Sequence, residues 1–423
     1  MIDSSTALVG IFADDLTGAL DAAAPFAANG FRTVVSSNSE LPHGAESAEV
    51  VSINLGTRHM DPTDIAGHVE KSVGALADLG ARVILNKVDS TLRGNPGVEL
   101  TIALRKLSAD HAVLCPAYPQ NGRTVENGIL LVNGMPVVDT DVGQDRLSPL
   151  PSSGVENIVL SSLDRAGLSL QVHLFGNDGG RAVSDLLPVI IAADARTDSD
   201  LQVLAERVVG AGSRAFVAGS AGVSIALADA LRNSRGSLRP QTGTISTGRR
   251  ILIVTASQRT IVDQQITALG AEIDSMHAEL TVDEAIEGVS DDSISRMTEV
   301  VRNEGVVVLQ VGKPAAGEDL GVDELRSVAE KITRNLGVFV RAITDASIPD
   351  VIVIIGGDTT SGVLAACGVT SLELQGELQP GTVSAVPGDG SIAGGFLVTR
   401  AGGFGDENSL LELVSLLQIG HGV

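Results

Sequence analysis

Aromatic and basic residues are scarce in this chain. Its 423 residues include no Trp, one Tyr and eight Phe, and 29 Lys and Arg stand against 52 Asp and Glu, which gives a formal net charge of −23. So few aromatic rings exclude a base-stacking platform and leave only an aliphatic pocket for an adenine ring. The acidic balance argues against nucleic acid and anionic membrane surfaces as partners, although a local basic cluster can still bind a phosphorylated or carboxylated small molecule.

Cysteines, long apolar runs and several common motifs are also missing. Cys115 and Cys367 lie far apart, outside any CxxC spacing, and are interpreted as small core residues in a reducing cytosol. The N-terminus has no basic region and no apolar stretch reaches the length of a membrane span, so we expect a soluble, cytoplasmic protein. There is no GxxxxGK[ST] motif, which argues against a P-loop enzyme. The His residues show no HExxH or HxH spacing, which argues against a zinc site. The GxGxxA sequence at 388–393 follows a proline and precedes no helical pattern, so we do not interpret it as a dinucleotide-binding site.

The pattern that is present is typical of an α/β protein, with 43% hydrophobic residues and 48 glycines. The length suits two domains, and residues 233–250 are polar, rich in Gly, Ser and Pro, and aperiodic. We therefore expect an N-terminal domain over 1–235, a linker over 236–250 and a C-terminal domain over 251–423. Strands are predicted at 7–13, 33–36, 50–55, 81–88, 111–116, 214–220, 251–256, 306–311, 351–355 and 394–399, helices at 19–29, 62–79 and 322–336, helices ending near 107, 231 and 418, and a hairpin at 128–138.

A glycine turn stands out in the second half, in the stretch VIVIIGGDTTSG from Val351 to Gly362. Its five aliphatic residues predict a buried parallel strand, and the two glycines allow a tight turn and close approach of a ligand. Asp358, Thr359 and Thr360 are typical helix caps, so a helix is expected from Ser361 to Cys367. A strand, a glycine turn and a helix start form an anion site through unpaired N–H groups and the helix dipole. An ordinary βα turn explains the same stretch equally well.

Polar loops with charges follow three predicted strands of the first half: DDLTG at 14–18, DSTLRGN at 89–95 and QNGRT at 120–124. Ligands of open α/β sheets bind outside the carboxyl ends of the strands, where these loops should meet. Asp14 and Asp15 can bind sugar hydroxyls or take a proton, and Lys87, Arg93 and Arg123 suit a carboxylate or a phosphoryl group. For one loop alone, helix capping and solvated surface charge are equal explanations. The shared edge favours a ligand site.

Two reaction classes fit these loops. One is a kinase, with a small polyol acid on the first domain and a nucleotide on the glycine loops of the second. The other is an aspartyl-phosphate phosphohydrolase of the haloacid dehalogenase type, whose D-x-D-x-T signature resembles DDLTG. With Asp14 as nucleophile, however, the second acid of that signature would fall at Leu16, which cannot donate a proton. The later GDxxxD metal motif of that class would need Asp where Gly362 stands. The spacing therefore argues against a phosphohydrolase. A sugar-acid binding or sensor protein is a third alternative, but it would not need two glycine-loop domains.

These motifs taken together resemble the four-carbon acid sugar kinase family, which includes threonate, erythronate and 3-oxo-tetronate kinases. The resemblance covers nearly the whole chain. It rests on ADDLTGA (13–19), KVDSTLRGN (87–95), PAYPQNGRT (116–124), LSPL (147–150), TASQRT (255–260), GGDTTSG (356–362), GELQPG (376–381) and AGGFGDE (401–407). The short KVDSTLRGN form looks like the threonate and erythronate branch. Gly403 stands where many members carry Asn.

The resemblance implies an N-terminal substrate-binding domain, a C-terminal nucleotide-binding domain and an active site in the cleft between them. Positions that match the family's ATP site are Ser257, Gly356, Gly357, Asp358, Thr359 and Gly402. Positions that match its acid-sugar site are Asp14, Asp15, Lys87, Asp89, Ser90 and Arg93, to which the strand-end argument adds Arg123.

The implied reaction uses ATP with Mg²⁺ and phosphorylates the terminal hydroxyl of a four-carbon sugar acid, giving a 4-phospho-aldonate. We expect Arg93, or less favourably Lys87, to bind the acid's carboxylate, and Asp15 or Asp14 to take the hydroxyl proton. Mg²⁺ is inferred from phosphoryl-transfer chemistry and its ligands stay unassigned. The expected partners are the sugar acid and ATP, without nucleic acid or membrane, and a homo-oligomer is compatible with the sequence. The stereochemistry of the acid stays open.

Overall fold

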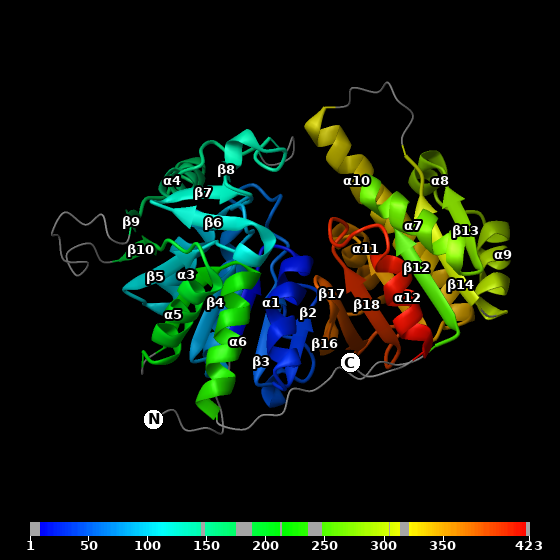
Figure 1. Ribbon diagram of the computed structural model, residues 1–423, viewed down its shortest axis with the longest axis horizontal. Helices are drawn as coiled ribbons and strands as arrows, with labels where there is room; N and C mark the ends of the chain where they lie inside the picture. Colours follow the sequence, from blue (N-terminus) through cyan, green and yellow to red (C-terminus); the bar gives the residue numbers. More distant parts are fainter. Residues whose placement is uncertain are drawn as a thin grey trace. The chain divides into compact units, whose positions relative to one another are not determined.

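The computed structural model describes residues 9–144, 149–174, 188–211, 214–235, 248–303, 305–313 and 321–419. The chain divides into two compact units, Met1–Pro240 and Gln241–Val423, each built from strands and helices (Figure 1). The division falls inside the predicted linker, of which residues 236–247 lie outside the described residues. The same holds for residues 7–8 of the first predicted strand and for 147–148 of the LSPL motif.

The N-terminal unit contains a parallel sheet in the order β2-β3-β1-β4-β11-β5-β10-β9. Most of these strands are short aliphatic runs that are buried on both faces, as parallel strands covered by helices require. The strands are β1 (Val9–Ala13), β2 (Thr33–Ser36), β3 (Val50–Asn54), β4 (Val83–Lys87), β5 (His111–Cys115), β9 (Gln171–Leu174), β10 (Val189–Ala192) and β11 (Ala215–Gly219).

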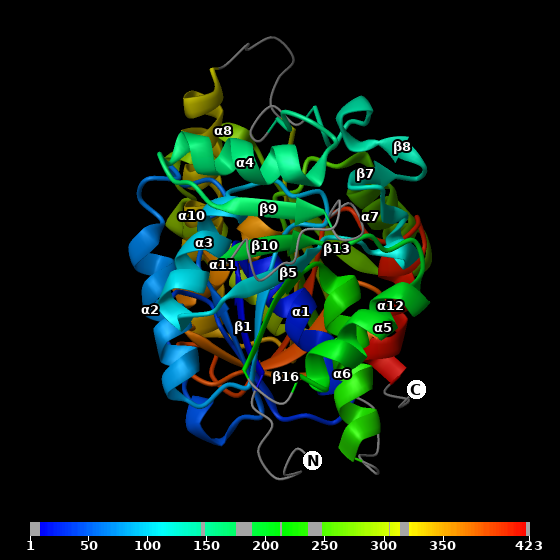
Figure 2. The same cartoon turned by 90° about the vertical axis from the view of Figure 1, so that its left-hand side faces the viewer.

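Helices form a layer on each side of this sheet (Figure 2). On one side α1 packs on α6 and α6 on α5, and on the other α2, α3 and α4 pack in succession. The predicted hairpin is confirmed within a small antiparallel sheet, β6-β7-β8. The bounds are α1 (Leu16–Ala28), α2 (Ala66–Asp78), α3 (Pro96–Leu107), α4 (Val155–Arg165), α5 (Asp198–Val209), α6 (Ala221–Arg235), β6 (Arg123–Glu126), β7 (Ile129–Val132) and β8 (Met135–Pro136).

The C-terminal unit contains the parallel run β13-β14-β12-β15-β18, to which β17 and β16 add antiparallel. Helix α7 packs on α12, while α10 packs on α8, α9 and α11. None of the helices in the described ranges is both long and apolar enough to cross a bilayer. The bounds are β12 (Arg250–Thr255), α7 (Thr260–Glu272), β13 (Ser275–Leu280), α8 (Val282–Glu287), α9 (Asp291–Arg302), β14 (Gly305–Val311), α10 (Val322–Ala346), β15 (Val351–Ile355), α11 (Gly357–Cys367), β16 (Ser371–Gln379), β17 (Thr382–Pro387), β18 (Phe396–Arg400) and α12 (Ser409–Ile419).

Helix ends are where the predictions were wrong. Helix α1 begins at Leu16 and not near residue 19, because Asp15 Oδ1 accepts the backbone N–H of Gly18 at 2.7 Å and caps the helix earlier. Helix α2 begins at residue 66 instead of 62, because Asp61 Oδ1 accepts the N–H of Thr63 in a turn that precedes it. Helices α6 and α10 run on to residues 235 and 346, beyond the expected 231 and 336.

The two cysteines lie in the core as expected. Cys115 and Cys367 are both free and buried. Burial raises the pKa of the Cys115 thiol to about 12, so this sulfur stays a neutral, unreactive core atom at physiological pH.

Gly97 allows α3 and α4 to approach closely, and this contact generates a stability prediction. A Cβ at this position would lie 2.4 Å from Val159 O and 2.7 Å from Ser162 Oγ. Gly97→Ala should therefore lower the free energy of unfolding by about 1–3 kcal/mol, the usual cost of overpacking. At Gly67 in α2 the same atom would meet nothing within 4 Å, so Gly67→Ala should be neutral or stabilising by about 0.4–1 kcal/mol. Urea denaturation measures both, and equal stabilities would contradict the packing argument.

Candidate active site

The three polar loops of the N-terminal unit meet at one edge of its sheet, as predicted. Strand β1 is the neighbour of β4, with Ala13 opposite Lys87, and β11 separates β4 from β5. Because all these strands are parallel, their carboxyl ends emerge on the same edge. We call this edge the acidic-basic rim; its predicted members are Asp14, Asp15, Lys87, Asp89, Ser90, Arg93 and Arg123.

Arg58 forms ion pairs with both acids of the first rim loop, and it was not among the predicted residues. Its guanidinium donates through Nε and Nη2 to the two oxygens of Asp14, at 2.7 Å each, and through Nη1 to Asp15 Oδ2 at 2.5 Å. A bidentate pair of this kind fixes both partners in one geometry. A signal was present in the sequence, since residue 58 lies in the loop that follows the predicted strand at 50–55.

Burial governs the electrostatics of this pair. Asp14 is 3% exposed, and burial raises the pKa of its carboxyl against the opposing effect of Arg58. Burial alone would lower the pKa of Arg58, but the negative charges of Asp14, Asp15 and Asp89 raise it well above its usual value. The guanidinium is therefore a permanent cation at the base of the rim. Asp15 is more open, with a side chain that is 27% exposed.

Asp89 and Arg93 form a second bidentate pair in the loop after β4. Arg93 Nε and Nη2 donate to the carboxylate at 3.0 and 2.9 Å, and Thr91 also donates to it. Burial would raise the pKa of Asp89, but the hydrogen bond from Arg93 and the charges of Arg58 and Arg93 lower it far below its usual range. Leu92, between the partners, has a φ of 60°, a conformation that non-glycine residues seldom adopt. The loop is thus held tightly in one shape.

Lys87 and Arg123 carry cationic groups that are less fully engaged. Lys87 is 5% exposed, and its Nζ donates to Val88 O at 3.1 Å. Arg123 donates to Asn121 O, but its buried Nε has no hydrogen-bond partner within the described residues. Burial lowers the pKa of Arg123, and its neighbours include Asp89 and Arg93. A buried guanidinium nitrogen without an acceptor is a site where an anionic ligand can bind.

The glycine turn of the C-terminal unit has the predicted position but a different cap. Gly356 is itself the N-cap, with a φ of 108°, and α11 begins at Gly357, so the prediction that Asp358, Thr359 and Thr360 cap a later helix was wrong. The left-handed φ is open to glycine and puts the first turn of the helix directly after the strand. The two threonines bond elsewhere: Thr359 Oγ1 accepts the N–H of Ala256, and Thr360 Oγ1 donates to Gly356 O.

The predicted nucleotide residues converge on this turn from three neighbouring strands, β12, β15 and β18. Gly356 N donates to Arg400 O at 2.8 Å. A Cβ on Gly402 would lie 2.8 Å from Ser257 Oγ and 4.0 Å from Gly356 Cα, so glycine is needed for this close approach. Asp358 is exposed in the first turn of α11. We call this edge the glycine rim; its N–H groups and helix start can bind an anion.

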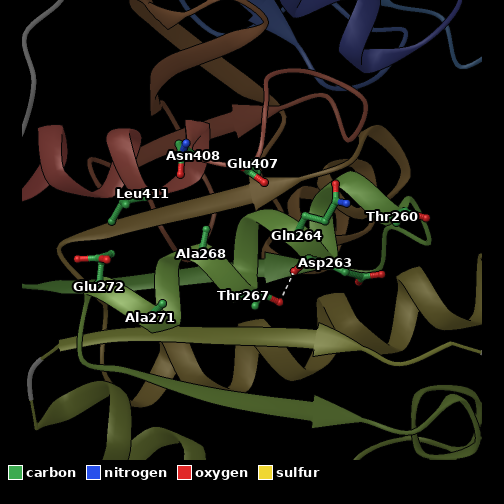
Figure 3. Close-up of a pocket in the computed structure, with 10 residues that line it drawn as sticks. All are labelled: Thr260, Asp263, Gln264, Thr267, Ala268, Ala271, Glu272, Glu407, Asn408 and Leu411. Atoms are coloured by element: carbon green, nitrogen blue, oxygen red, sulfur yellow. Dashed lines mark hydrogen bonds between the residues drawn. The ribbon is translucent and has the colours of Figure 1, made fainter.

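A hollow of about 530 Å³ lies in the C-terminal unit between α7 and the start of α12 (Figure 3). Its lining combines the apolar side chains of Ala268, Ala271 and Leu411 with the carboxylates of Asp263, Glu272 and Glu407. Carboxylates repel phosphate oxygens, so the chemistry of the hollow disfavours the phosphates of a nucleotide.

Comparison with known proteins defines the class of the chain. Residues 9–227 match the model of a sugar-binding N-terminal domain, and residues 252–410 match that of a nucleotide-binding C-terminal domain. A D-threonate kinase of Bordetella bronchiseptica is 30% identical, with 97% of each chain covered. A 3-oxo-tetronate kinase of Pseudomonas fluorescens is 26% identical, with 99% of each covered. The crystal structure of a Haemophilus influenzae protein shares the fold, with a TM-score of 0.73 at 20% identity, covering 97% of this chain and 100% of that one.

A domain for a sugar joined to a domain for a nucleotide is the architecture of a phosphotransferase. The chain belongs to the four-carbon acid sugar kinase family. The kinase prediction is thereby confirmed, and the phosphohydrolase and sensor alternatives are set aside.

The Arg58 pair generates a prediction with a pH dependence. Arg58→Ala leaves Asp14 buried without its cation, and breaking a buried pair in this way typically costs about 3–5 kcal/mol. The loss should be largest at neutral pH and smaller towards about pH 4, because a carboxyl with a raised pKa takes up its proton at a higher pH than an ordinary aspartate and, once neutral, needs no cation. Urea denaturation at the two pH values measures the difference.

Lys71→Ala is the matched control, because the Lys71–Glu40 pair is exposed, with side chains 56% and 58% accessible. Removing an exposed pair should cost less than about 1 kcal/mol at either pH. A similar loss in both variants would show that burial does not govern the Arg58 pair.

Proposed function

We propose that this enzyme transfers the γ-phosphoryl group of ATP to the terminal (4-) hydroxyl of a four-carbon sugar acid such as D-threonate or D-erythronate. The observation that carries the proposal is the acidic-basic rim, where buried cations and carboxylates from separate loops lie on one edge of the sheet. An anion with several hydroxyls needs both signs of charge within a few ångströms. The names of the relatives, D-threonate and 3-oxo-tetronate kinase, support this substrate class.

The carboxylate of the acid is assigned to Lys87 and Arg123. Arg93, expected in this role from the sequence, directs two of its donors at Asp89, whereas the buried Nε of Arg123 has no acceptor among the described residues. Asp89 and Arg93 then shape the loop and, with Ser90, border the bound acid. Charge-assisted bonds from two cations fix the carboxyl end and leave the far hydroxyl free to react.

Asp14 and Asp15 are assigned to the reacting hydroxyl. Each can accept its hydrogen bond and take its proton as the new P–O bond forms. Asp15 is the more accessible of the two, while both oxygens of Asp14 accept from Arg58. We therefore favour Asp15 as the proton acceptor, with Asp14 orienting it through their shared guanidinium.

The phosphates of ATP are assigned to the glycine rim: Ser257, Gly356, Gly357, Asp358, Thr359 and Gly402. Backbone N–H groups at the start of α11 supply donors without any cationic side chain. A Mg²⁺ ion bound with the nucleotide would supply the charge neutralisation that phosphoryl transfer requires. Within the described residues no group of three His, Cys, Asp or Glu side chains could bind a metal ion, so phosphate oxygens and water would supply most ligands.

The test is an ADP-release assay against D-threonate, L-threonate, D-erythronate and a 3-oxo-tetronate. We expect turnover with one of the first three and a much lower kcat/KM for the 3-oxo acid, since the short KVDSTLRGN loop resembles the threonate and erythronate branch. A clear preference for the 3-oxo acid would replace the proposed substrate with the alternative within the same family. ADP release that does not depend on any acid would overturn the proposal.

Two variants separate the roles of the two rims. Asp15→Asn keeps an N-cap of comparable strength but removes the base, so kcat should fall at least about a hundredfold while the KM for ATP is unchanged. Gly357→Val places a branched side chain on the first turn of α11 and should raise the KM for ATP while acid binding persists. Steady-state kinetics with each substrate varied measures both. Wild-type turnover in Asp15→Asn, or lost acid binding in Gly357→Val, would contradict the assignment.

A further inference from the structure

Glu99 is a carboxylic acid inside the protein that none of the steps above uses. It lies in the first turn of α3, and its residue is 1% exposed. Buried carboxyls are seldom found without a partner, since an isolated charge is costly to remove from water. Its position beneath the acidic-basic rim makes its contacts informative.

The hydrogen bonds of Glu99 and its helix connect it to the chain segment that carries Arg58. Thr57 Oγ1 donates to Glu99 Oε1 at 2.6 Å, and Thr57 precedes Arg58 in the chain. Asn95, at the start of the same helix, donates to Thr57 O and Met60 O at 3.3 and 3.2 Å. From the other side, Arg58 N donates to Asp14 O at 3.1 Å. The segment that carries the guanidinium is therefore fixed from beneath by α3 and from the side by the loop after β1.

The charge state of Glu99 matters because the surrounding charges are closely balanced. The charged groups that face it are Asp14 from the β1 loop and Arg58 from the β3 loop. Burial, and next the negative charge of Asp14, raise the pKa of Glu99 to about 8, although Thr57, Asn86 and Arg58 oppose them. At neutral pH the group is thus a neutral acid. Asn86 is fully buried as well, and its side chain interacts with the Glu99 carboxyl.

We propose that Glu99 is a positioning residue of the acid-sugar site: as a neutral acid it holds Thr57, and through it Arg58, against Asp14 and Asp15, and loss of its proton weakens binding of the anionic substrate. An ionised Glu99 would add a negative charge beside Asp14 and compete for the same guanidinium. It would also make the rim less favourable to a carboxylate ligand. This inference rests on the proposed function of the rim.

The test compares Glu99→Gln with Glu99→Leu across the pH range from about 6 to 9.5. Gln keeps an oxygen for the Thr57 hydroxyl and is neutral at every pH, whereas Leu removes the acceptor. In the wild type, kcat/KM for the sugar acid should fall above about pH 8, by up to about tenfold per pH unit. In Glu99→Gln this alkaline decline should disappear, and in Glu99→Leu kcat/KM should be at least about tenfold lower than in Glu99→Gln at all pH values. The KM for ATP should be unchanged in both.

Glu377→Gln is the matched control. Burial also raises the pKa of Glu377, which lies in the C-terminal unit and accepts the N–H of Gly381 at 2.7 Å. This variant should keep the alkaline decline. Should Glu99→Leu fail to fold, Thr57→Val removes the same hydrogen bond from the other side and should show the same loss. A decline with an unchanged midpoint in Glu99→Gln, or wild-type kcat/KM in both Glu99→Leu and Thr57→Val, would overturn the inference.

Thermal unfolding separates this inference from the proposed function. A buried acid with a raised pKa loses its stabilising contribution as pH rises from its unfolded to its folded pKa, so the wild type should lose stability relative to Glu99→Gln between about pH 4.5 and 8. If this difference is present but no sugar acid is phosphorylated, the substrate class is wrong and the neutral acid at position 99 stands. If the difference is absent, the inference fails whatever the substrate.

Discussion

The ion pairs of Arg58 with Asp14 and Asp15 are the interaction on which the acidic-basic rim depends. A buried guanidinium is stable only with carboxylates around it, and a buried carboxylate only with a cation. Each partner therefore requires the other, and their ion pairs join the two loops that carry them, after β1 and β3. Below this pair, Thr57 and Glu99 continue the polar network into the interior.

The two units present anion sites of different chemistry. In the N-terminal unit the donors are side chains whose charges are balanced inside the protein, so selectivity follows from where each charge lies. In the C-terminal unit the donors are backbone N–H groups, which Gly356 and Gly402 expose by allowing close approach. Backbone N–H donors can bind a phosphate chain, whose oxygens are alike. Side chains fixed at particular positions can bind a small acid, whose hydroxyls differ in position. This division matches the sugar-binding and nucleotide-binding domains that the family models define.

Much of this arrangement could be predicted from the sequence, because it follows from short-range patterns. Aliphatic runs that end in polar or glycine-containing loops identified the strands, and the parallel-sheet rule placed Asp14, Lys87 and Asp89 on one edge. Pairing partners could not be predicted in the same way. Arg58 comes from the loop between β3 and α2, and no local spacing indicates that it meets Asp14. Glu99 was missed because an acid in a helix is ordinarily exposed, and only the packing of α3 shows that this one is buried. The cap of α11 was predicted wrongly because the residue types that usually cap helices follow Gly356, while the backbone conformation of the glycine decides where the helix begins.

The chain's single tyrosine occupies an informative place. Tyr118 lies in the loop after β5, where its backbone N donates to Arg123 O at 2.8 Å and Arg123 N donates back to its carbonyl at 3.0 Å. With no tryptophan anywhere in the sequence, this one phenol ring dominates the protein's near-ultraviolet emission. The intrinsic fluorescence of the unlabelled enzyme is therefore a local optical reporter of the loop that carries Arg123.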